Sequence, residues 1–213
     1  MRIVLLFSKT SKMKQVIFKS PLFILVITLI GGLLFSANIA AQSKHKSTGA
    51  VNIVIEGTSN IHDWDIKSDK GTCTSVFDVN NAGSLKSISA LSFSVPAKSL
   101  KSKHSGMDKN TYKALNATNY SSIDFTAASV DIKPSGNVGY ILTTKGKLTI
   151  AGTSREVSLL ANGTVNPDKS ITYSGTYHLK MTEYKVAPPT AMLGTIKTGD
   201  DVVVKFNMVL KVL

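Results

Sequence analysis

The sequence is poor in cysteine, in internal repeats and in acidic side chains. It holds one cysteine among 213 residues, so no disulfide framework can form within one chain. No repeat of 20–50 residues is visible, which excludes a solenoid or a propeller. Asp and Glu number only 13 against 25 Lys and Arg, giving a net charge of +12. Hydrophobic residues make up 43% of the chain, which excludes a disordered polymer.

The first 41 residues contain no acidic side chain and are ordered like a targeting segment. Five basic residues precede the apolar stretch Leu22–Phe35, and small residues follow it up to Ala41. This order is typical of a secretory signal peptide. The alternative is an uncleaved anchor, but the apolar stretch is shorter than the roughly 20 residues that span a bilayer. We therefore predict cleavage after Ala41, with Met1 or Met13 as the start.

Export places the mature chain, residues 42–213, in the periplasm or outside the cell. That location removes genomic DNA as a natural partner, despite the positive charge, so we expect no nucleic acid. No cysteine follows the apolar stretch, so the segment is not a lipoprotein signal.

From residue 50 onward, apolar and polar residues alternate with the period of β-strands. The clearest run places apolar side chains at every second position: Val202, Val204, Phe206, Met208, Leu210 and Val212. Turn-forming residues separate the runs at 80–83, 134–137, 166–169 and 198–201. Hairpin-like spacing favours antiparallel pairing, and closure would remove exposed edges. We predict an all-β fold, a closed antiparallel β-barrel of about eight strands.

One segment departs from alternation and predicts a short helix. Met107, Thr111, Ala114 and Leu115 have helical spacing within residues 105–119, after a long loop that begins at Pro96. Ser105 and Asp108 stand three residues apart, as in a weak capping box. We expect this helix to cover an opening or an edge of the barrel.

Several stretches together resemble the YceI-like family of secreted bacterial lipid-binding proteins. They are Ile55–Trp64, Val95–Leu100, Met107–Leu115, Tyr120–Phe125 and Gly146–Val157, where the last contains Gly-x-Leu-Thr-Ile-x-Gly-Thr-x-Arg. The resemblance covers nearly the whole mature chain. It implies a lipocalin-like barrel whose interior takes a polyisoprenoid, a quinone or a similar lipid, without catalysis or a cofactor.

Large side chains on the inward phase of the strands are the candidate lipid contacts. They are Phe77, Phe93, Phe125, Tyr140, Leu142, Tyr177, Met181 and Phe206. Burying an apolar chain is worth about 0.8 kcal/mol per methylene, so such a ligand needs no polar partner. The alternative is that these side chains fill a solid core, which would leave a structural or interaction module of the cell envelope. Alternation alone does not separate the two.

Lysines gather in residues 96–113, between the predicted strand and the end of the predicted helix. The segment contains one acidic residue, Asp108, and five lysines: Lys98, Lys101, Lys103, Lys109 and Lys113. If this segment is the lid, Lys98, Lys101, Lys103 and Lys109 are candidates to meet a lipid head group or an anionic membrane. The alternative is a solvated basic loop.

The remaining reactive residues give no catalytic pattern. On a strand, His62 and Asp63 point to opposite faces, so we predict no metal site and a structural role: Trp64 packs, while Asn60 and Asp63 satisfy turn amides. We interpret Cys73 as a buried inert thiol. An envelope hydrolase would need a nucleophile–base pair, and none stands at a readable spacing.

The dipeptide Pro188-Pro189 interrupts the strands near the end of the chain. It predicts a long loop at one mouth of the barrel. Met192 and Leu193 follow it and are further candidates to touch the ligand.

Overall fold

The computed structural model describes residues 43–47, 51–79, 84–137 and 139–212. All of them belong to one unit, Ala41–Leu213. The predicted signal peptide, residues 1–41, lies outside these residues, and its cleavage stays a prediction. No helix within the described ranges has the length and apolar character needed to cross a bilayer.

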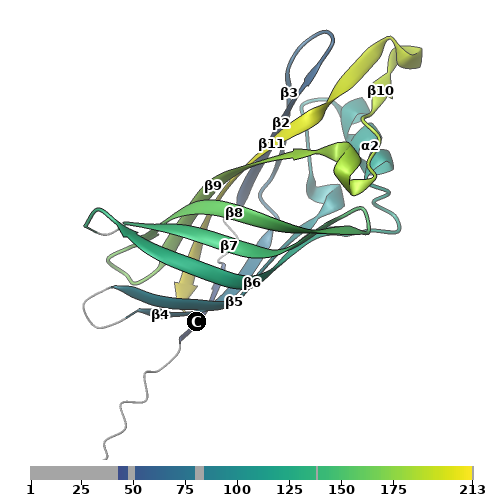
Figure 1. Cartoon of the computed structure of the whole chain (residues 1–213). Helices are drawn as coiled ribbons and strands as arrows, with labels where there is room; N and C mark the ends of the chain where they lie inside the picture. Colours follow the sequence, from purple (N-terminus) through teal and green to yellow (C-terminus); the bar gives the residue numbers. More distant parts are fainter. Residues whose placement is uncertain (1–42, 48–50, 80–83, 138, 213) are drawn as a thin grey trace, which may run out of the picture. The chain divides into compact units, whose positions relative to one another are not determined.

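Within the described residues, nearly all elements are strands (Figure 1). The strands are β1 (Ser43–Ser47), β2 (Asn52–Ser59), β3 (Trp64–Ser68), β4 (Thr72–Val79), β5 (Leu85–Pro96), β6 (Ser122–Ser135), β7 (Gly139–Ile150), β8 (Thr153–Val165), β9 (Ile171–Lys180), β10 (Thr190–Ala191) and β11 (Ile196–Val212). The helical elements are α2 (Ser105–Ala114) and the short 3-10 helices η1 (Ala97–Ser99), η2 (Met181–Tyr184) and η3 (Met192–Gly194). The predicted all-β fold with one short helix is confirmed.

Alternation in the sequence corresponds to the two faces of the sheet. On β7, Leu142, Thr144 and Gly146 are buried, whereas Lys145 and Lys147, which flank Gly146, are exposed. Successive side chains of a strand point to opposite faces, so the apolar phase faces inward along the whole strand. Every strand pair in the sheet is antiparallel, as the hairpin-like spacing predicted.

The sheet is a curled half-barrel, open rather than closed, so the predicted closed barrel is wrong. The strand order runs β1-β4-β5-β6-β7-β8-β9-β11-β2-β3. β3 forms one margin, where the one bridge to the segment after β5 in the described residues joins Lys67 and Lys101. The chain leaves β5 for η1 and α2 instead of adding a strand beside β3. At the far end β1 pairs with both β4 and β11 and joins the two sides.

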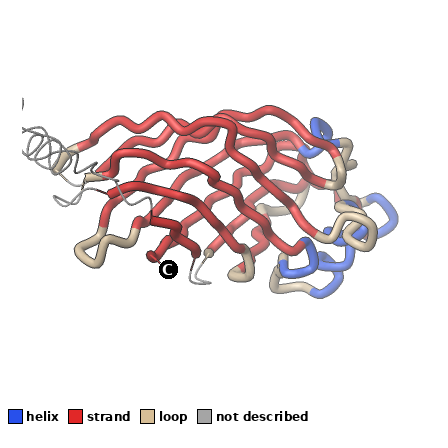
Figure 2. Tube along the Cα trace, turned by 90° about the horizontal axis from the view of Figure 1, so that it is seen from below, coloured by secondary structure: helices blue, strands red, loops and turns tan. Residues whose placement is uncertain are grey.

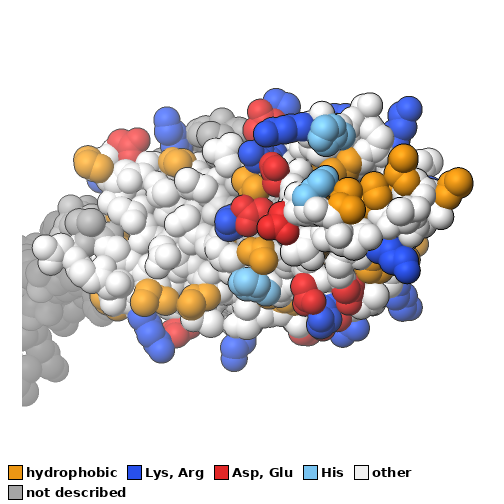
Figure 3. Space-filling model, turned by 90° about the horizontal axis from the view of Figure 1, so that it is seen from above, with side chains coloured by type: hydrophobic (Ala, Val, Ile, Leu, Met, Phe, Trp, Pro, Cys, Tyr) orange, Lys and Arg blue, Asp and Glu red, His pale blue; other side chains and the backbone are white. Residues whose placement is uncertain are grey.

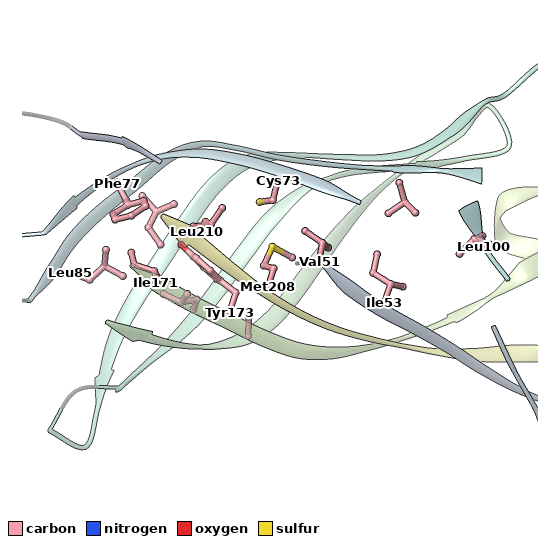
Figure 4. Close-up of a cluster of buried hydrophobic side chains, with 14 of the residues drawn as sticks. Val51, Ile53, Cys73, Phe77, Leu85, Leu100, Ile171, Tyr173, Met208 and Leu210 are labelled. Atoms are coloured by element: carbon pink, nitrogen blue, oxygen red, sulfur yellow. The ribbon is translucent and has the colours of Figure 1, made fainter. Parts of the chain in front are cut away.

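The end near β1 is packed shut by large apolar side chains (Figure 4). Phe77, Leu142, Ile171 and Leu210 have no exposed surface. Full burial of such a side chain stabilises a fold by about 1.5–3 kcal/mol. This cluster is the solid part of the core, and it anchors the strands whose other ends form the mouth.

The helical elements gather at the opposite end from this packed core (Figure 2). α2 ends at Ala114 and a turn continues to Asn119, within the range predicted from the sequence. The predicted capping box is wrong, because His104 is the N-cap residue and makes no side-chain cap. The carboxylate of Asp108 instead accepts hydrogen bonds from the loop before the helix.

Candidate functional site

A cavity of about 720 Å³ opens beside α2 and extends inward along the curled sheet. Its wall comes from β2 to β9 and β11, with α2 and the segment after η2 at the mouth. The wall is almost entirely apolar, and no acidic side chain of the described residues lines it. Sites for small apolar ligands have this size and this character.

Cross-strand pairing builds the deeper wall from rows of inward side chains. Cys73, Phe93, Phe125 and Leu148 are successive partners across β4, β5, β6 and β7, and all four line the cavity. Gly146 lies beneath this row, where an added Cβ would stand 2.8 Å from the Phe125 ring. The Thr126 carbonyl oxygen of β6 lies closer still to that position, so glycine lets both the neighbouring strand and the ring approach β7.

A second row crosses the opposite wall. Ile53, Phe206, Gly175 and Ala161 are successive partners across β2, β11, β9 and β8. The Phe206 ring lies over Gly175, at the place that any side chain there would occupy. Ile53, Phe206 and Ala161 all line the cavity. The two rows give the interior aromatic and aliphatic walls on both sides.

The structure brings five of the eight predicted lipid contacts together on the cavity wall. These are Phe93, Phe125, Tyr177, Met181 and Phe206. Phe77, Tyr140 and Leu142 also face inward but belong to the packed end. The Tyr140 hydroxyl accepts a hydrogen bond from the Leu85 amide at 2.9 Å, so it helps to close that end. Contact with a ligand stays a prediction for all of them.

The lysine that lines the described cavity lies at its mouth. Lys109 of α2 lines the mouth together with His62 and His104, and Lys98, Lys101 and Lys103 do not line it. Lys101 lies 3.6 Å from Asp108 and 5.2 Å from the centre of the Tyr112 ring. Of the four predicted head-group lysines, Lys109 is therefore the one placed to meet a ligand that projects from the cavity.

Hydrogen bonds fix the loop of residues 98–102 against α2. The Asp108 carboxylate accepts from the Ser102 amide at 2.7 Å and from its hydroxyl at 2.8 Å. The Tyr112 hydroxyl donates to the carbonyls of Leu100 and Lys98. Desolvation alone would raise the pKa of Asp108, but the bonds from Ser102 and the charge of Lys101 outweigh it and lower the pKa. We call residues 97–114 the lid.

Three titratable side chains of the described residues that line the interior, Cys73, Tyr173 and Tyr184, have raised pKa values and are uncharged at neutral pH. Burial raises the pKa of the Cys73 thiol to about 12, so the thiol stays protonated and is a poor nucleophile. Burial also raises the pKa of Tyr173 and, with Tyr177 beside it, that of Tyr184. The Tyr173 hydroxyl has no hydrogen-bond partner among the described residues. Such an interior favours an uncharged ligand body.

The Thr58–Trp64 stretch has a structural role at the mouth. The Trp64 indole donates to the Thr58 carbonyl at 2.9 Å, and its ring packs on Gly57. The side chains of Asn60 and Asp63 were predicted to accept from the amides of this turn. The amides of Ile61 and His62 instead donate to the Ser59 hydroxyl. Across the described residues, no group of three or more His, Cys, Asp or Glu side chains is placed to hold a metal ion.

Sequence reasoning missed part of the mouth. Ile61, His62 and His104 line it, yet they lie in loops and carry no periodic signal. Met192, predicted from its place after the proline pair, lines the mouth, whereas Leu193 is fully exposed.

The model of a protein family described as the YceI-like domain matches residues 41–210. Among solved structures, Burkholderia cenocepacia BcnA is similar at a TM-score of 0.57 and 17% identity, covering 75% of this chain and 95% of that one. A polyisoprenoid binding domain from Saccharophagus degradans, implicated in plant cell wall breakdown, is similar at a TM-score of 0.60 and 11% identity, covering 81% and 99%. No curated protein matches.

At these identities the likeness to solved structures concerns the fold alone. The family model spans most of the chain, from two residues before β1 to Leu210 in β11. Both results agree with the resemblance found in the sequence motifs. The chain belongs to the YceI-like family.

Proposed function

We propose that this chain is a non-enzymatic carrier that holds one apolar lipid, a polyisoprenoid, a quinone or a similar long-chain molecule, inside the half-barrel. The observation that carries the proposal is the cavity of about 720 Å³ with an apolar wall and a lysine at its mouth. Membership in the YceI-like family supports it, because this is a family of binding proteins. One structure with the same fold is described as a polyisoprenoid binding domain.

The cavity has the length to hold an extended chain. Its lining on β11 runs from Ile196 to Met208, about 40 Å of strand at ~3.3 Å per residue. Barrel strands tilt by roughly 35–45°, so this corresponds to about 30 Å along the axis. Each buried methylene contributes about 0.8 kcal/mol, so a dozen or so suffice for tight binding without a polar contact.

The distribution of charge supports one orientation of the ligand in this proposal. The apolar body lies against the Phe93–Phe125 row and the Phe206 wall, where the described residues place no acidic side chain. A polar or anionic head lies at the mouth beside Lys109, with His62 and His104 on the same rim. The reverse orientation would bury a polar head against uncharged walls, which costs free energy unless hydrogen bonds replace water.

The carrier works in the periplasm or outside the cell in this proposal. The support is the basic, apolar and small-residue order of residues 1–41, and the family match begins at residue 41. N-terminal sequencing of the protein isolated from its host tests this directly. A mature chain that begins at Gln42 is expected; a retained N-terminus would contradict it.

The filled-core module is the competing function. It needs no cavity, so the hollow beneath the lid favours the carrier, while the packed cluster around Phe77 occupies only the end near β1. A hydrolase finds no support in Cys73, because its raised pKa leaves it without a thiolate at neutral pH.

Native mass spectrometry of protein purified gently from its own host tests the carrier. We expect the mass of the purified protein to exceed that of the bare chain by about one lipid molecule. Organic extraction should release a lipid of that mass. A preparation that carries no lipid, and that takes up no prenol or quinone when these are added, would contradict the proposal.

A further inference from the structure

Three large apolar side chains project into solvent at the mouth of the cavity. Leu193 is fully exposed, Met192 is 73% exposed and Ile61 is 57% exposed. Large exposed hydrophobic side chains that occur together mark contact surfaces. Figure 3 shows hydrophobic side chains gathered over this end of the molecule, among Lys and His.

The two loops that carry them are fastened together. Asn60 donates from its amide to the Lys197 carbonyl at 3.1 Å and from its side chain to the Thr195 carbonyl at 2.9 Å. It also accepts from the Lys197 amide at 2.8 Å. The turn after β2 and the turn before β11 therefore form one rigid projection. We call Ile61, Met192 and Leu193 the docking edge.

The backbone of the docking edge has an unfavourable conformation at Met192 and Leu193. Met192 and Leu193 have φ of +50° and +54°, in the left-handed region that residues with side chains rarely adopt. A turn of this kind places the two apolar side chains on the rim, and Leu193 gains no burial in return. The exposure of these side chains is thus built into the loop.

The docking edge is continuous with the cavity wall. Ile61 and Met192 line the mouth as well as the outer surface, and Ile196 continues the apolar lining inward along β11. A long apolar chain that enters here stays in contact with apolar surface throughout. That path removes the cost of exposing each methylene to water during transfer.

The chain segments around the mouth are positively charged. Residues 60–63, 97–114 and 181–197 contain Lys98, Lys101, Lys103, Lys109, Lys113, Lys185 and Lys197, against Asp63, Asp108 and Glu183. Each lysine near an anionic bilayer strengthens binding by about fivefold. A symmetric dimer through the same edge would place these lysines against their own copies, which disfavours a second chain as the occupant.

We propose that the docking edge inserts into the surface of an anionic lipid bilayer, so that cargo passes directly between the bilayer and the cavity. This rests on the proposed carrier function and adds the partner surface and the residues that meet it. Ile61, Met192 and Leu193 enter the interface, the lysines face the lipid phosphates, and the cavity mouth lies against the membrane.

Vesicle co-sedimentation of the chain expressed from its full-length sequence tests the docking edge. The vesicles are phosphatidylcholine alone, or equimolar phosphatidylcholine and phosphatidylglycerol. We expect binding to the anionic vesicles that weakens with added salt. Leu193→Asp should weaken it by about tenfold or more, because an inserted leucine is lost and a repelled charge is added. Leu160→Asp is the matched control, since Leu160 is 61% exposed on β8 and lies outside the cavity.

Binding of geranylgeraniol dispersed in detergent is measured in parallel from the fluorescence of Trp64, the single tryptophan. Leu193→Asp should bind it as the unchanged chain does, yet take it up more slowly from vesicles. Equal vesicle binding by the unchanged chain and Leu193→Asp overturns the docking edge. So does self-association that Leu193→Asp abolishes, in the absence of vesicle binding. Failure to bind geranylgeraniol counts against the carrier instead, whatever the vesicles show.

Discussion

A large side chain introduced into the cavity wall tests whether the interior of the half-barrel is hollow or filled. Thr144 is buried on the inward face of β7 and lines the cavity between Leu142 and Gly146. Its neighbour Thr143 lies on the outward face and pairs with the exposed Leu160. Thr144→Phe places a ring where the ligand would lie, and Thr143→Phe makes the same substitution on the outside.

The two substitutions have different expected magnitudes. The Thr144→Phe ring displaces roughly four to six methylenes of ligand, which at about 0.8 kcal/mol each weakens lipid binding by about 3–5 kcal/mol, a hundredfold or more. The free energy of unfolding of the lipid-free chain should stay equal or rise, because the ring fills empty space. Thr143→Phe should change neither quantity by more than about 0.5 kcal/mol.

Chemical denaturation and lipid titration of the lipid-free chains give both quantities. If the space beneath the lid were packed, Thr144→Phe would overfill it and lower the free energy of unfolding by about 1–3 kcal/mol. That loss, together with unchanged lipid binding, would refute the existence of the cavity and the carrier with it.

Three further predictions concern the thiol, the lid and the mouth. Cys73 should react with a thiol reagent about a thousandfold more slowly than a free cysteine near pH 8, since a pKa of about 12 leaves little thiolate. Bound lipid should slow this reaction further. Fast labelling that does not depend on lipid would contradict the burial of Cys73. The lowered pKa of Asp108 implies that its carboxylate stabilises the fold above its unfolded-state pKa and loses that effect as the pH falls through the lowered folded-state pKa. The difference in Tm between the unchanged chain and Asp108→Asn should therefore be full at neutral pH and shrink as the pH falls below about 4. A difference that stays constant with pH would exclude a charge effect. Gly57→Ala should displace the Trp64 ring from β2, shift the tryptophan fluorescence and lower the free energy of unfolding by about 1–3 kcal/mol. The control is Gly106→Ala, whose added methyl group meets no atom within 4 Å, and it should leave the stability unchanged or raise it.

The sequence predicted the faces of the strands well because a period of two fixes which side chains point inward. It did not predict depth along the barrel. Phe77 and Leu142 have the same phase as Phe93 and Phe125, yet they lie in the packed end and the others line the cavity. Depth depends on the stagger between strands, and that stagger is set by pairing partners far apart in the chain.

Closure and the mouth were beyond sequence reasoning for related reasons. Whether the sheet closes depends on the path after Pro96, where the chain forms η1 and α2 and leaves the outer side of β3 without a partner strand in the described residues. Ile61 and His62 reach the mouth through a turn whose position is fixed by Asn60 bonds to residues 195 and 197. No local sequence pattern predicts a contact between residues that lie so far apart in the chain.

The five-residue strand β1 has a consequence for when this protein can fold. It joins the two sides of the sheet by pairing His45 with Val212 and Lys46 with Lys211, across almost the full length of the described residues. That pairing requires β11 to have left the ribosome, and contacts of such long range make folding slow. Until then the two sides of the sheet stay unjoined, so the strands between them cannot complete their packing.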